Sequence, residues 1–321
     1  MNHSARVYDS VFELLPDEHN PTPLVRLQRM NPTREFELYA KLEWMNPLGS
    51  VKDRAAWAML RDLEQRGEVR EGRGIVEPTS GNTGISLAAM ASARGYPMRA
   101  VLPDRVPREK KVLLKLCGAE LDIVSDELCP SPGLSDGSIN LAKTHAKASR
   151  DRYVMPNQYE NPLNVEAHRR TTGPEIWRQT EGRITHFFVA LGTCGTVTGT
   201  SQFLREKKPD VKIIAVQPSE GHDIPGVRTV RQLAVSRLYD ESLIDEVLEV
   251  DFELAYTRAA ELCRGEALLA SPCCGLVYEG ARRVIEHAGA GVGVMIFADN
   301  VFKYTSLMAT HLPGLMAGTP V

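Results

Sequence analysis

The sequence predicts an α/β protein built on parallel, doubly wound sheets, and three observations support that prediction. Short apolar runs alternate with segments of helical periodicity along most of the 321 residues. The apolar runs are mostly continuous, as expected for strands that have helices on both faces. The alternation of strands and helices is typical of parallel sheets. The chain is long enough for two domains or for one large α/β unit.

Each expected element follows either from a continuous apolar run or from helical periodicity. Strands are predicted where an apolar run is bounded by polar or turn residues, at 74–78, 98–103, 119–125, 185–191, 212–218 and 293–299. Helices are predicted where apolar residues recur every three or four positions, at 53–66, 83–94, 109–118, 139–150, 166–179, 196–208, 252–264 and 277–287. Two further stretches, 126–137 and 219–231, are expected to be loops, and the first is rich in Pro, Gly and Ser.

The charge balance disfavours several classes of partner. The net charge is −3 and 25% of the residues are charged, whereas a nucleic-acid or anionic-membrane partner normally needs a basic excess. No apolar run approaches the roughly 18 residues of a membrane span, and the first twenty residues lack the pattern of a signal peptide. These features predict a cytoplasmic protein with no nucleic-acid or membrane partner.

The cysteines do not have the spacing of a metal site. The sequence has six of them: Cys117, Cys129, Cys194, Cys263, Cys273 and Cys274. None forms a CxxC pair, and no His/Cys spacing resembles a zinc site. In a reducing compartment we expect them to be buried thiols rather than disulfides, and we expect no metal.

One lysine stands at an unusual place. In WMNPLGSVKDRAAWAML, Lys52 follows a Gly-Ser turn and precedes a helical segment. A helix N-terminus disfavours a cation, because the macrodipole already places partial positive charge there. Lys52 is either a solvated side chain that pairs with Asp53 or Glu43, or an amine that is kept neutral for chemistry.

Two strand-to-helix loops have the composition of anion-binding sites. The polar residues of the first loop, EPTSGNTGI, are Thr79, Ser80, Asn82 and Thr83. Hydroxyls, an amide and free backbone N–H groups at a helix N-terminus suit a carboxylate or a phosphate. A helix cap needs only one such residue, so a binding site is favoured.

The second loop, LGTCGTVTG, contains Gly and Thr but no acid, which suits a phosphate. It is neither a P-loop nor a GxGxxG motif, which disfavours a nicotinamide-dependent oxidoreductase. A third segment, LLASPCCG, is weak evidence alone, and a tight packing turn is the favoured interpretation of it.

Taken together and in this order, these segments resemble fold-type II pyridoxal-phosphate enzymes of the cysteine synthase and cystathionine β-synthase family. The resemblance rests on NPTPLVRL, KLEWMNPLGSVKDR, EPTSGNTGIS, NQYENPLN, LGTCGTVTG and ADNVFKYTS, which span nearly the whole chain. It implies two doubly wound α/β domains with mostly parallel sheets, similar to tryptophan synthase β. The smaller, mobile substrate-binding domain would comprise residues 47–155, and the larger cofactor-phosphate-binding domain would comprise 1–46 and 156–321. The resemblance also implies a homodimer.

The resemblance assigns roles to individual residues. Lys52 is expected to form the Schiff base with pyridoxal phosphate and to be the catalytic base at Cα, which suits a neutral amine. The expected cofactor-binding residues are Lys52, Asn82, Gly192, Thr193, Cys194, Gly195, Thr196 and Cys273. The expected substrate-binding residues are Thr79, Ser80, Gly81, Thr83, Gln158 and Arg228. Within these sets, Asn82 would bind the ring hydroxyl of the cofactor, and the TSGNTG loop with Gln158 would bind the substrate's α-carboxylate.

Two residues depart from the family pattern. The phosphate loop usually has the sequence Gly-Thr-Gly-Gly-Thr, and its third position here is Cys194. A side chain is expected to be tolerated there unless the position needs a positive φ. Cys273 stands where the family places a Ser or Thr against the pyridine nitrogen, and a thiol is the weaker donor. We expect activity to survive both changes.

The implied reaction is β-replacement on an activated L-serine, O-phosphoserine or O-acetylserine, with sulfide or another sulfur donor to form L-cysteine. Arg228 is expected to bind the donor's phosphate, because an arginine fork suits a dianion better than a neutral acetyl group. A solvated surface arginine is the alternative. Three alternative functions remain compatible with the sequence. They are β-replacement with an amine or homocysteine as acceptor, deamination by a lyase of the same fold, and binding by a catalytically degenerate paralogue.

Overall fold

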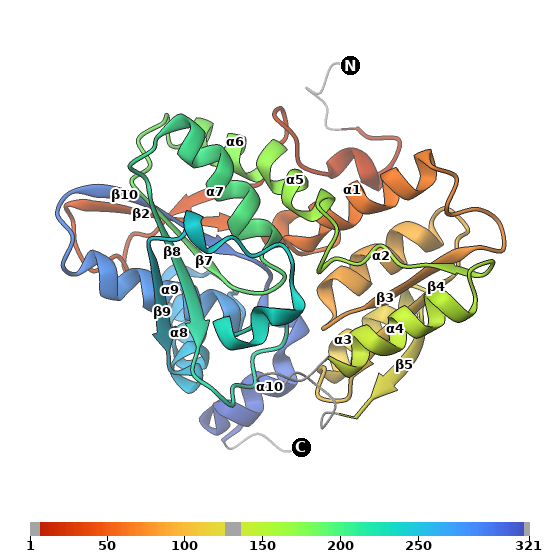
Figure 1. Ribbon diagram of the computed structural model, residues 1–321. Coiled ribbons are helices and arrows are strands. Elements are labelled where there is room, and N and C mark those ends of the chain that lie inside the picture. Colours follow the sequence, from red (N-terminus) through yellow and green to blue (C-terminus); the bar gives the residue numbers. More distant parts are fainter. Residues whose placement is uncertain (1–6, 126–135, 318–321) are drawn as a thin grey trace.

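The computed structural model describes residues 7–125 and 136–317, so almost all of the loop expected at 126–137 lies outside the described residues. Within these residues the strands form two sheets, which lie on opposite sides of the molecule in Figure 1. In spatial order, the larger sheet contains β1 (Leu24–Arg26), β2 (Phe36–Leu42), β10 (Gly291–Phe297), β7 (His186–Ala190), β8 (Lys212–Pro218) and β9 (Glu246–Val250). The smaller sheet contains β5 (Glu120–Val124), β4 (Met98–Pro103), β3 (Gly74–Pro78) and β6 (Tyr153–Val154).

Both sheets are parallel almost throughout. The pair β1–β2 is antiparallel, and all other neighbouring strands run parallel. The predicted fold class, α/β with two doubly wound and mostly parallel sheets, is therefore confirmed. The strands of the smaller sheet lie within residues 47–155 and those of the larger sheet lie outside that range. The domain boundaries themselves stay a prediction.

The helices follow the predicted order. They are α1 (Lys52–Gln65), α2 (Asn82–Ser92), α3 (Arg108–Leu116), α4 (Gly137–Ala148), α5 (Leu163–Arg170), α6 (Thr172–Gln179), α7 (Gly195–Lys207), α8 (Phe252–Glu266), α9 (Pro272–Ile285) and α10 (Thr305–His311). The single helix predicted over 166–179 was wrong, because the chain breaks at Thr171, which has φ −124° and ψ −68°. Pro174 lacks an N–H and its ring would clash with the preceding turn, so a new helix begins at Thr172.

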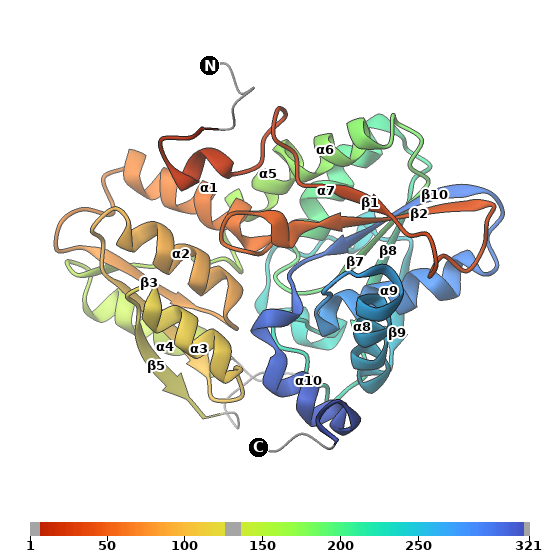
Figure 2. The ribbon, with the colours of Figure 1, turned by 180° about the vertical axis from the view of Figure 1, so that it is seen from behind.

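Helices cover both faces of the larger sheet. Neighbouring residues on a strand point to opposite faces, and on β7 Phe188 packs with the core under α8 and α9 whereas Phe187 packs with the core under α6 and α7. Figure 2 shows α8 and α9 on the near side of this sheet. Both rings are fully buried. This arrangement explains why the central strands are continuous apolar runs.

The smaller sheet is covered in the same way. On β3, Ile75 packs with α1 and α2, whereas the next residue, Val76, packs with Ala142 of α4. Helix α1, which begins at Lys52, therefore contributes its apolar face to the core of the smaller sheet.

The sequence missed the shorter or more polar elements. Strands β1, β2, β6 and β9 and helix α10 were not predicted. β2 carries a lysine, Lys41, which is fully buried, and β9 is an edge strand with three exposed residues. Neither strand is a continuous apolar run, because one contains a buried charge and the other faces solvent.

Candidate active site

The carboxyl ends of strands from both sheets converge on one cavity. The segments that follow β3, β7 and β10 line it, and its volume is about 830 Å³ with the open mouth included. Ligands of open α/β proteins bind at such strand ends. Every site residue predicted from the sequence lines this cavity except Gly195, which lies directly between two lining residues, Cys194 and Thr196. The structure therefore brings the predicted set together, while the individual roles stay predictions.

Lys52 is the first residue of α1 and is partly buried in the cavity wall. Its Nζ lies 3.5 Å from Thr193 Oγ1 in the second loop. Burial lowers the pKa of the Lys52 amine, and the nearby carboxylate of Asp299 only partly opposes that effect. The interpretation of Lys52 as an amine shifted toward its neutral form is therefore supported by geometry and by the direction of its pKa.

The second loop, Gly192 to Thr196, leads into the N-terminus of α7, so free backbone N–H groups face the cavity end of that helix. Neighbouring side chains hold the loop: Ser236 Oγ donates to Thr193 O at 2.7 Å, and Asn164 Nδ2 donates to Thr193 Oγ1 at 3.0 Å. A Cβ on Gly195 would lie 2.1 Å from Asn164 Oδ1, so this close approach requires glycine.

Cys194 has φ 69° and ψ 0°, in the left-handed region. The tolerance expected for this position depended on φ, and the observed φ is the one that favours glycine. A non-glycine residue there costs roughly 1 kcal/mol. Burial raises the pKa of the Cys194 thiol to about 12, so the side chain is neutral.

The first loop, Thr79 to Thr83, is shaped by its own polar groups. Thr79 Oγ1 accepts from the N–H groups of Gly81 and Gly84, both at 3.0 Å. Gly81 has φ 124°, and a Cβ there would lie 2.4 Å from Lys110 Cδ. The hydroxyl of Thr79 therefore caps the start of α2. Helix capping was one of the two roles that the sequence suggested for the polar residues of this loop.

Gln158 connects this loop to the segment before α5. Thr83 Oγ1 donates to Gln158 Oε1 at 2.5 Å, and Gln158 Nε2 donates to Pro78 O at 2.7 Å. The amide group is thus fixed beside the N-terminus of α2. The two glycine-rich loops and Gln158 therefore line the same cavity.

Asn82 takes part in a chain of polar contacts that the sequence did not predict. Asn82 Nδ2 donates to Asp299 Oδ2 at 2.7 Å, and Tyr304 Oη donates to the same oxygen at 2.6 Å. Lys110 Nζ in turn donates to Tyr304 Oη at 2.7 Å. Burial lowers the pKa of Lys110 to about 8. Asp299 was detectable as the first charged residue after an apolar strand, whereas Lys110 gave no signal, because it lies within an ordinary amphipathic helix.

Cys273 is at the start of α9 and lines the cavity as a buried thiol. Burial raises its pKa well above the ordinary value, so the thiol keeps its proton. It can therefore act as a weak hydrogen-bond donor, which is the role that the resemblance implies for this position.

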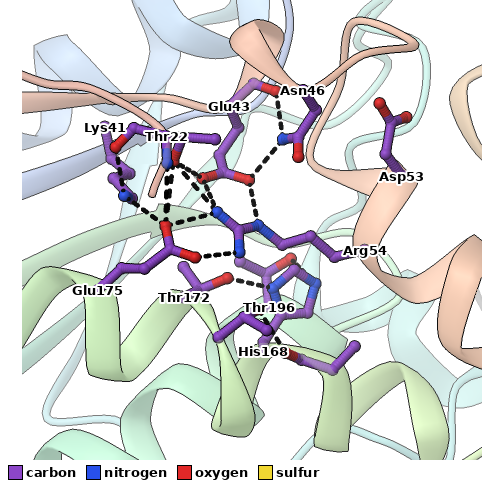
Figure 3. A network of polar contacts seen from close by, with 12 residues as sticks. Thr22, Lys41, Glu43, Asn46, Asp53, Arg54, His168, Thr172, Glu175 and Thr196 are labelled. Carbon is purple, nitrogen blue, oxygen red and sulfur yellow. Dashed lines mark hydrogen bonds and ion pairs between the residues drawn. The ribbon is translucent and has the colours of Figure 1, made fainter. Parts of the chain in front are cut away.

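A buried network of charges surrounds Arg54 of α1 (Figure 3). Arg54 Nε donates to Glu43 Oε2 at 2.7 Å, and Arg54 Nη1 donates to Glu175 Oε1 at 2.6 Å. Lys41 Nζ donates to Glu175 Oε2 at 2.7 Å, and Thr22 Oγ1 donates to Glu43 Oε1 at 2.7 Å. Two cations and two anions therefore balance, and together they tie α1 to β2 and α6.

His168 lies beside this network and contacts the second loop (Figure 3). One ring nitrogen is 2.8 Å from Thr172 Oγ1 and the other is 3.2 Å from Thr196 Oγ1. Burial, reinforced by Arg54 and Lys52, lowers the pKa of His168 to about 3. A neutral imidazole thus orients Thr196 over the whole physiological pH range.

The donor set of the cavity fits pyridoxal phosphate. Helix N-terminal amides and threonine hydroxyls suit a phosphate, and a lysine amine shifted toward its neutral form suits an aldehyde. The first loop, at the N-terminus of α2, offers a further set of hydroxyl and backbone donors for a substrate carboxylate. No helix within 7–125 and 136–317 is long and apolar enough to cross a membrane. The same residues contain no cluster of three or more His, Cys, Asp or Glu side chains arranged to hold a metal ion.

Comparison with known proteins agrees with this chemistry. Residues 15–299 match the family described as "Pyridoxal-phosphate dependent enzyme". The chain is 42% identical over 285 residues to cysteine synthase B of Salmonella typhimurium, covering 89% of this chain and 92% of that protein. It is 38% identical over 291 residues to the cysteine synthase of Aquifex aeolicus, covering 88% of both chains.

Solved structures give the same result. A crystal structure of O-ureido-L-serine synthase is 33% identical and superposes with a TM-score of 0.85, covering 95% of this chain and 96% of that one. A hydrogen sulfide-producing enzyme from Fusobacterium nucleatum is 28% identical with a TM-score of 0.80, covering 93% and 100%. The fold and the site define a fold-type II cofactor enzyme. The chain belongs to the pyridoxal-phosphate dependent enzyme family, within its cysteine synthase group.

Proposed function

We propose that this chain is a cysteine synthase, which replaces the leaving group of an activated L-serine by sulfide to form L-cysteine. The observation that carries the proposal is the Lys52 amine, whose pKa is lowered by burial, within one cavity that also holds two anion-binding loops. Two relatives that bear the name cysteine synthase, at 42% and 38% identity, support L-cysteine as the product.

The cofactor would be held by residues already in place. The phosphate would lie against the N-terminus of α7 and the hydroxyls of Thr193 and Thr196. Asn82, fixed by Asp299, would bind the ring hydroxyl, and Cys273 would donate to the ring nitrogen. When bound, pyridoxal phosphate supplies an electron sink that makes the Cα proton of an amino acid acidic.

The remaining chemistry belongs to the protein. The loop at the N-terminus of α2, together with Gln158, would bind the α-carboxylate and so place Cα within reach of Lys52. A neutral Lys52 amine would accept the Cα proton. The resulting ammonium would hold that proton near the departing group. The hydrogen bonds of Gln158 with Thr83 and Pro78 orient its amide before the substrate binds.

The test is product formation by the protein loaded with pyridoxal phosphate and supplied with O-acetyl-L-serine or O-phospho-L-serine and sulfide. We expect L-cysteine, and we expect Lys52→Ala to lower kcat at least about 1,000-fold, because both covalent attachment and proton transfer are lost. Lys115→Ala, which changes an exposed lysine of α3, serves as the matched control.

Other outcomes identify the competing functions. A 2-oxo acid and ammonia formed without sulfide would indicate a deaminating lyase. Product formed only with homocysteine or an amine would indicate a different acceptor. No product with any acceptor, despite bound cofactor, would indicate a catalytically degenerate paralogue.

The proposal extends to assembly and location, for which we infer a homodimer in the cytoplasm. The family resemblance supports the dimer, and the composition, which has no basic excess, supports the location. Light scattering is expected to give twice the 35.5 kDa mass of the chain, and a monomer at micromolar concentration would contradict the dimer.

A further inference from the structure

Arg228, expected from the sequence to bind a phosphate on the donor, has a protein carboxylate as its partner. Arg228 Nη2 lies 2.9 Å from Asp136 Oδ2 and 3.1 Å from Tyr159 Oη, and the guanidinium carbon is 5.1 Å from the centre of the Tyr159 ring. Arg228 and Asp136 are 8% and 3% exposed. The guanidinium is therefore part of a buried, charge-assisted contact rather than a solvated surface group.

Asp136 is fixed in this position by a second set of hydrogen bonds. Its Oδ1 accepts from Ser138 N at 3.0 Å, Ser138 Oγ at 2.5 Å and Ile139 N at 3.3 Å, so it is the N-cap of α4. One carboxylate oxygen caps the helix and the other holds Arg228. The side chain cannot release the arginine by rotating away without uncapping α4.

The ion pair links the two halves of the molecule beside the phosphate-binding loop. Arg228 N donates to Leu191 O at 2.9 Å, immediately before that loop. Gly192, the first residue of that loop, also packs closely against this segment, since a Cβ on Gly192 would lie 2.8 Å from Gly226 O. Asp136, in contrast, belongs to the helix that covers the smaller sheet.

The pair also lies between two cavities. Arg228 lines both the candidate active site and an adjoining cavity of about 530 Å³, and Asp136 lines the second of these. Asp136 thus places a negative charge beside Arg228, whose guanidinium is the only one among the described residues that line the candidate active site.

We propose that Asp136 is a specificity-determining residue, which holds Arg228 in an ion pair and so makes the enzyme favour donors with an uncharged leaving group over donors with a phosphate. This inference rests on the proposed function. A phosphate dianion at Arg228 would have to share the guanidinium with a carboxylate that α4 holds in place, and like charges at such a distance repel strongly in a buried site. An acetyl group meets no such repulsion. Neutralising Asp136 converts Arg228 into an anion-binding group.

The experiment compares kcat/KM for O-acetyl-L-serine and O-phospho-L-serine, with sulfide as acceptor, in the holoenzyme and in variants. We expect the unchanged protein to prefer O-acetyl-L-serine. Asp136→Asn is expected to raise kcat/KM for O-phospho-L-serine at least tenfold and to change kcat/KM for O-acetyl-L-serine less than threefold. Asp136→Ser, which keeps a good N-cap without charge, is the second variant and is expected to behave alike.

A matched control separates charge from capping. Asp251 caps α8 through Leu254 N at 3.0 Å and is exposed, so Asp251→Asn removes the charge of an N-cap away from the cavity while asparagine keeps the cap. This variant is expected to leave the donor ratio unchanged. Adding Arg228→Gln to Asp136→Asn is expected to abolish the gain. Inorganic phosphate is expected to become a competitive inhibitor against O-acetyl-L-serine in Asp136→Asn.

The outcomes distinguish this inference from the proposed function. An unchanged donor ratio in both folded Asp136 variants would reduce Asp136 to a helix cap, and a preference of the unchanged protein for O-phospho-L-serine would also overturn the inference. Neither result would contradict the proposed cysteine synthase activity. A failure of the unchanged protein to form cysteine from either donor would overturn the proposed function itself.

Discussion

Replacing Arg54 by methionine would test how much the buried charge network contributes to the stability of the fold. Among the described residues, the change leaves Glu43 with the neutral donors Thr22 and Asn46, and leaves Glu175 with Lys41 and Thr22. The net charge of the buried cluster changes from zero to minus one. Removing one partner of a buried ion pair typically costs 3–5 kcal/mol, because the other charge stays buried without compensation. We therefore expect the free energy of unfolding to fall by about 3–5 kcal/mol.

The assay is guanidinium chloride unfolding followed by tryptophan fluorescence. Arg66→Met at the end of the same helix is the control, because Arg66 pairs with Asp62 at 2.7 Å on the exposed surface, and such pairs contribute about 0–1 kcal/mol. The double variant Arg54→Met/Glu43→Gln leaves one balanced pair, so its cost is expected to be at least about 1 kcal/mol below the sum of the single costs.

Two results would refute this reasoning. One is a cost below about 1 kcal/mol for Arg54→Met, which would mean that water or a rearranged side chain replaces the guanidinium. The other is strict additivity in the double variant, which would mean that Arg54 and Glu43 act independently although Nε and Oε2 are 2.7 Å apart.

Three further predictions concern the site and its pH dependence. Cys194→Gly is expected to raise stability by up to roughly 1 kcal/mol in a melting experiment, because φ 69° costs glycine nothing; a fall in the melting temperature would show that the buried thiol outweighs the strain. Gly195→Ala is expected to weaken cofactor binding at least tenfold in a fluorescence titration, because its Cβ would displace Asn164, and unchanged affinity would contradict that contact. Burial raises the pKa of Asp53 to about 6, so the folded protein binds more protons than the unfolded chain between pH 4 and 6. The free energy of unfolding should fall as pH rises through that window, by up to about 1.4 kcal/mol per pH unit from this group. Asp53→Asn should remove that slope, and an identical slope in the variant would assign it to other groups.

The sequence predicted the elements and loops that are encoded locally. The loops around Asn82 and Gly192 could be found because glycine, hydroxyl and amide residues cluster within a few positions at the start of a helix. Lys52 could be found for the same reason, since its turn, its charge and its helix are contiguous. The parallel sheets followed from apolar runs such as β7 and β8, whose faces are both covered.

The remaining features depend on contacts between distant segments. Nothing local marks Lys41 as a buried cation, because its partner Glu175 is 134 positions away. The pairing of Asp136 with Arg228 spans 92 positions and appears only when the two halves of the molecule come together. The break between α5 and α6 was the exception: Pro174 was visible in the sequence, and greater weight on its missing N–H would have predicted it.

The most direct test of the account is to locate the lysine that carries the cofactor. The protein loaded with pyridoxal phosphate is reduced with borohydride, which makes the bond between the lysine amine and the cofactor permanent, and the modified peptide is sequenced by mass spectrometry. The account predicts modification of Lys52 alone. Lys110 and Lys303 are the informative alternatives, because both are buried amines with lowered pKa close to Asp299. Modification at either of them, or no modification of a protein that retains the cofactor, would contradict the assignment of Lys52 as the catalytic residue.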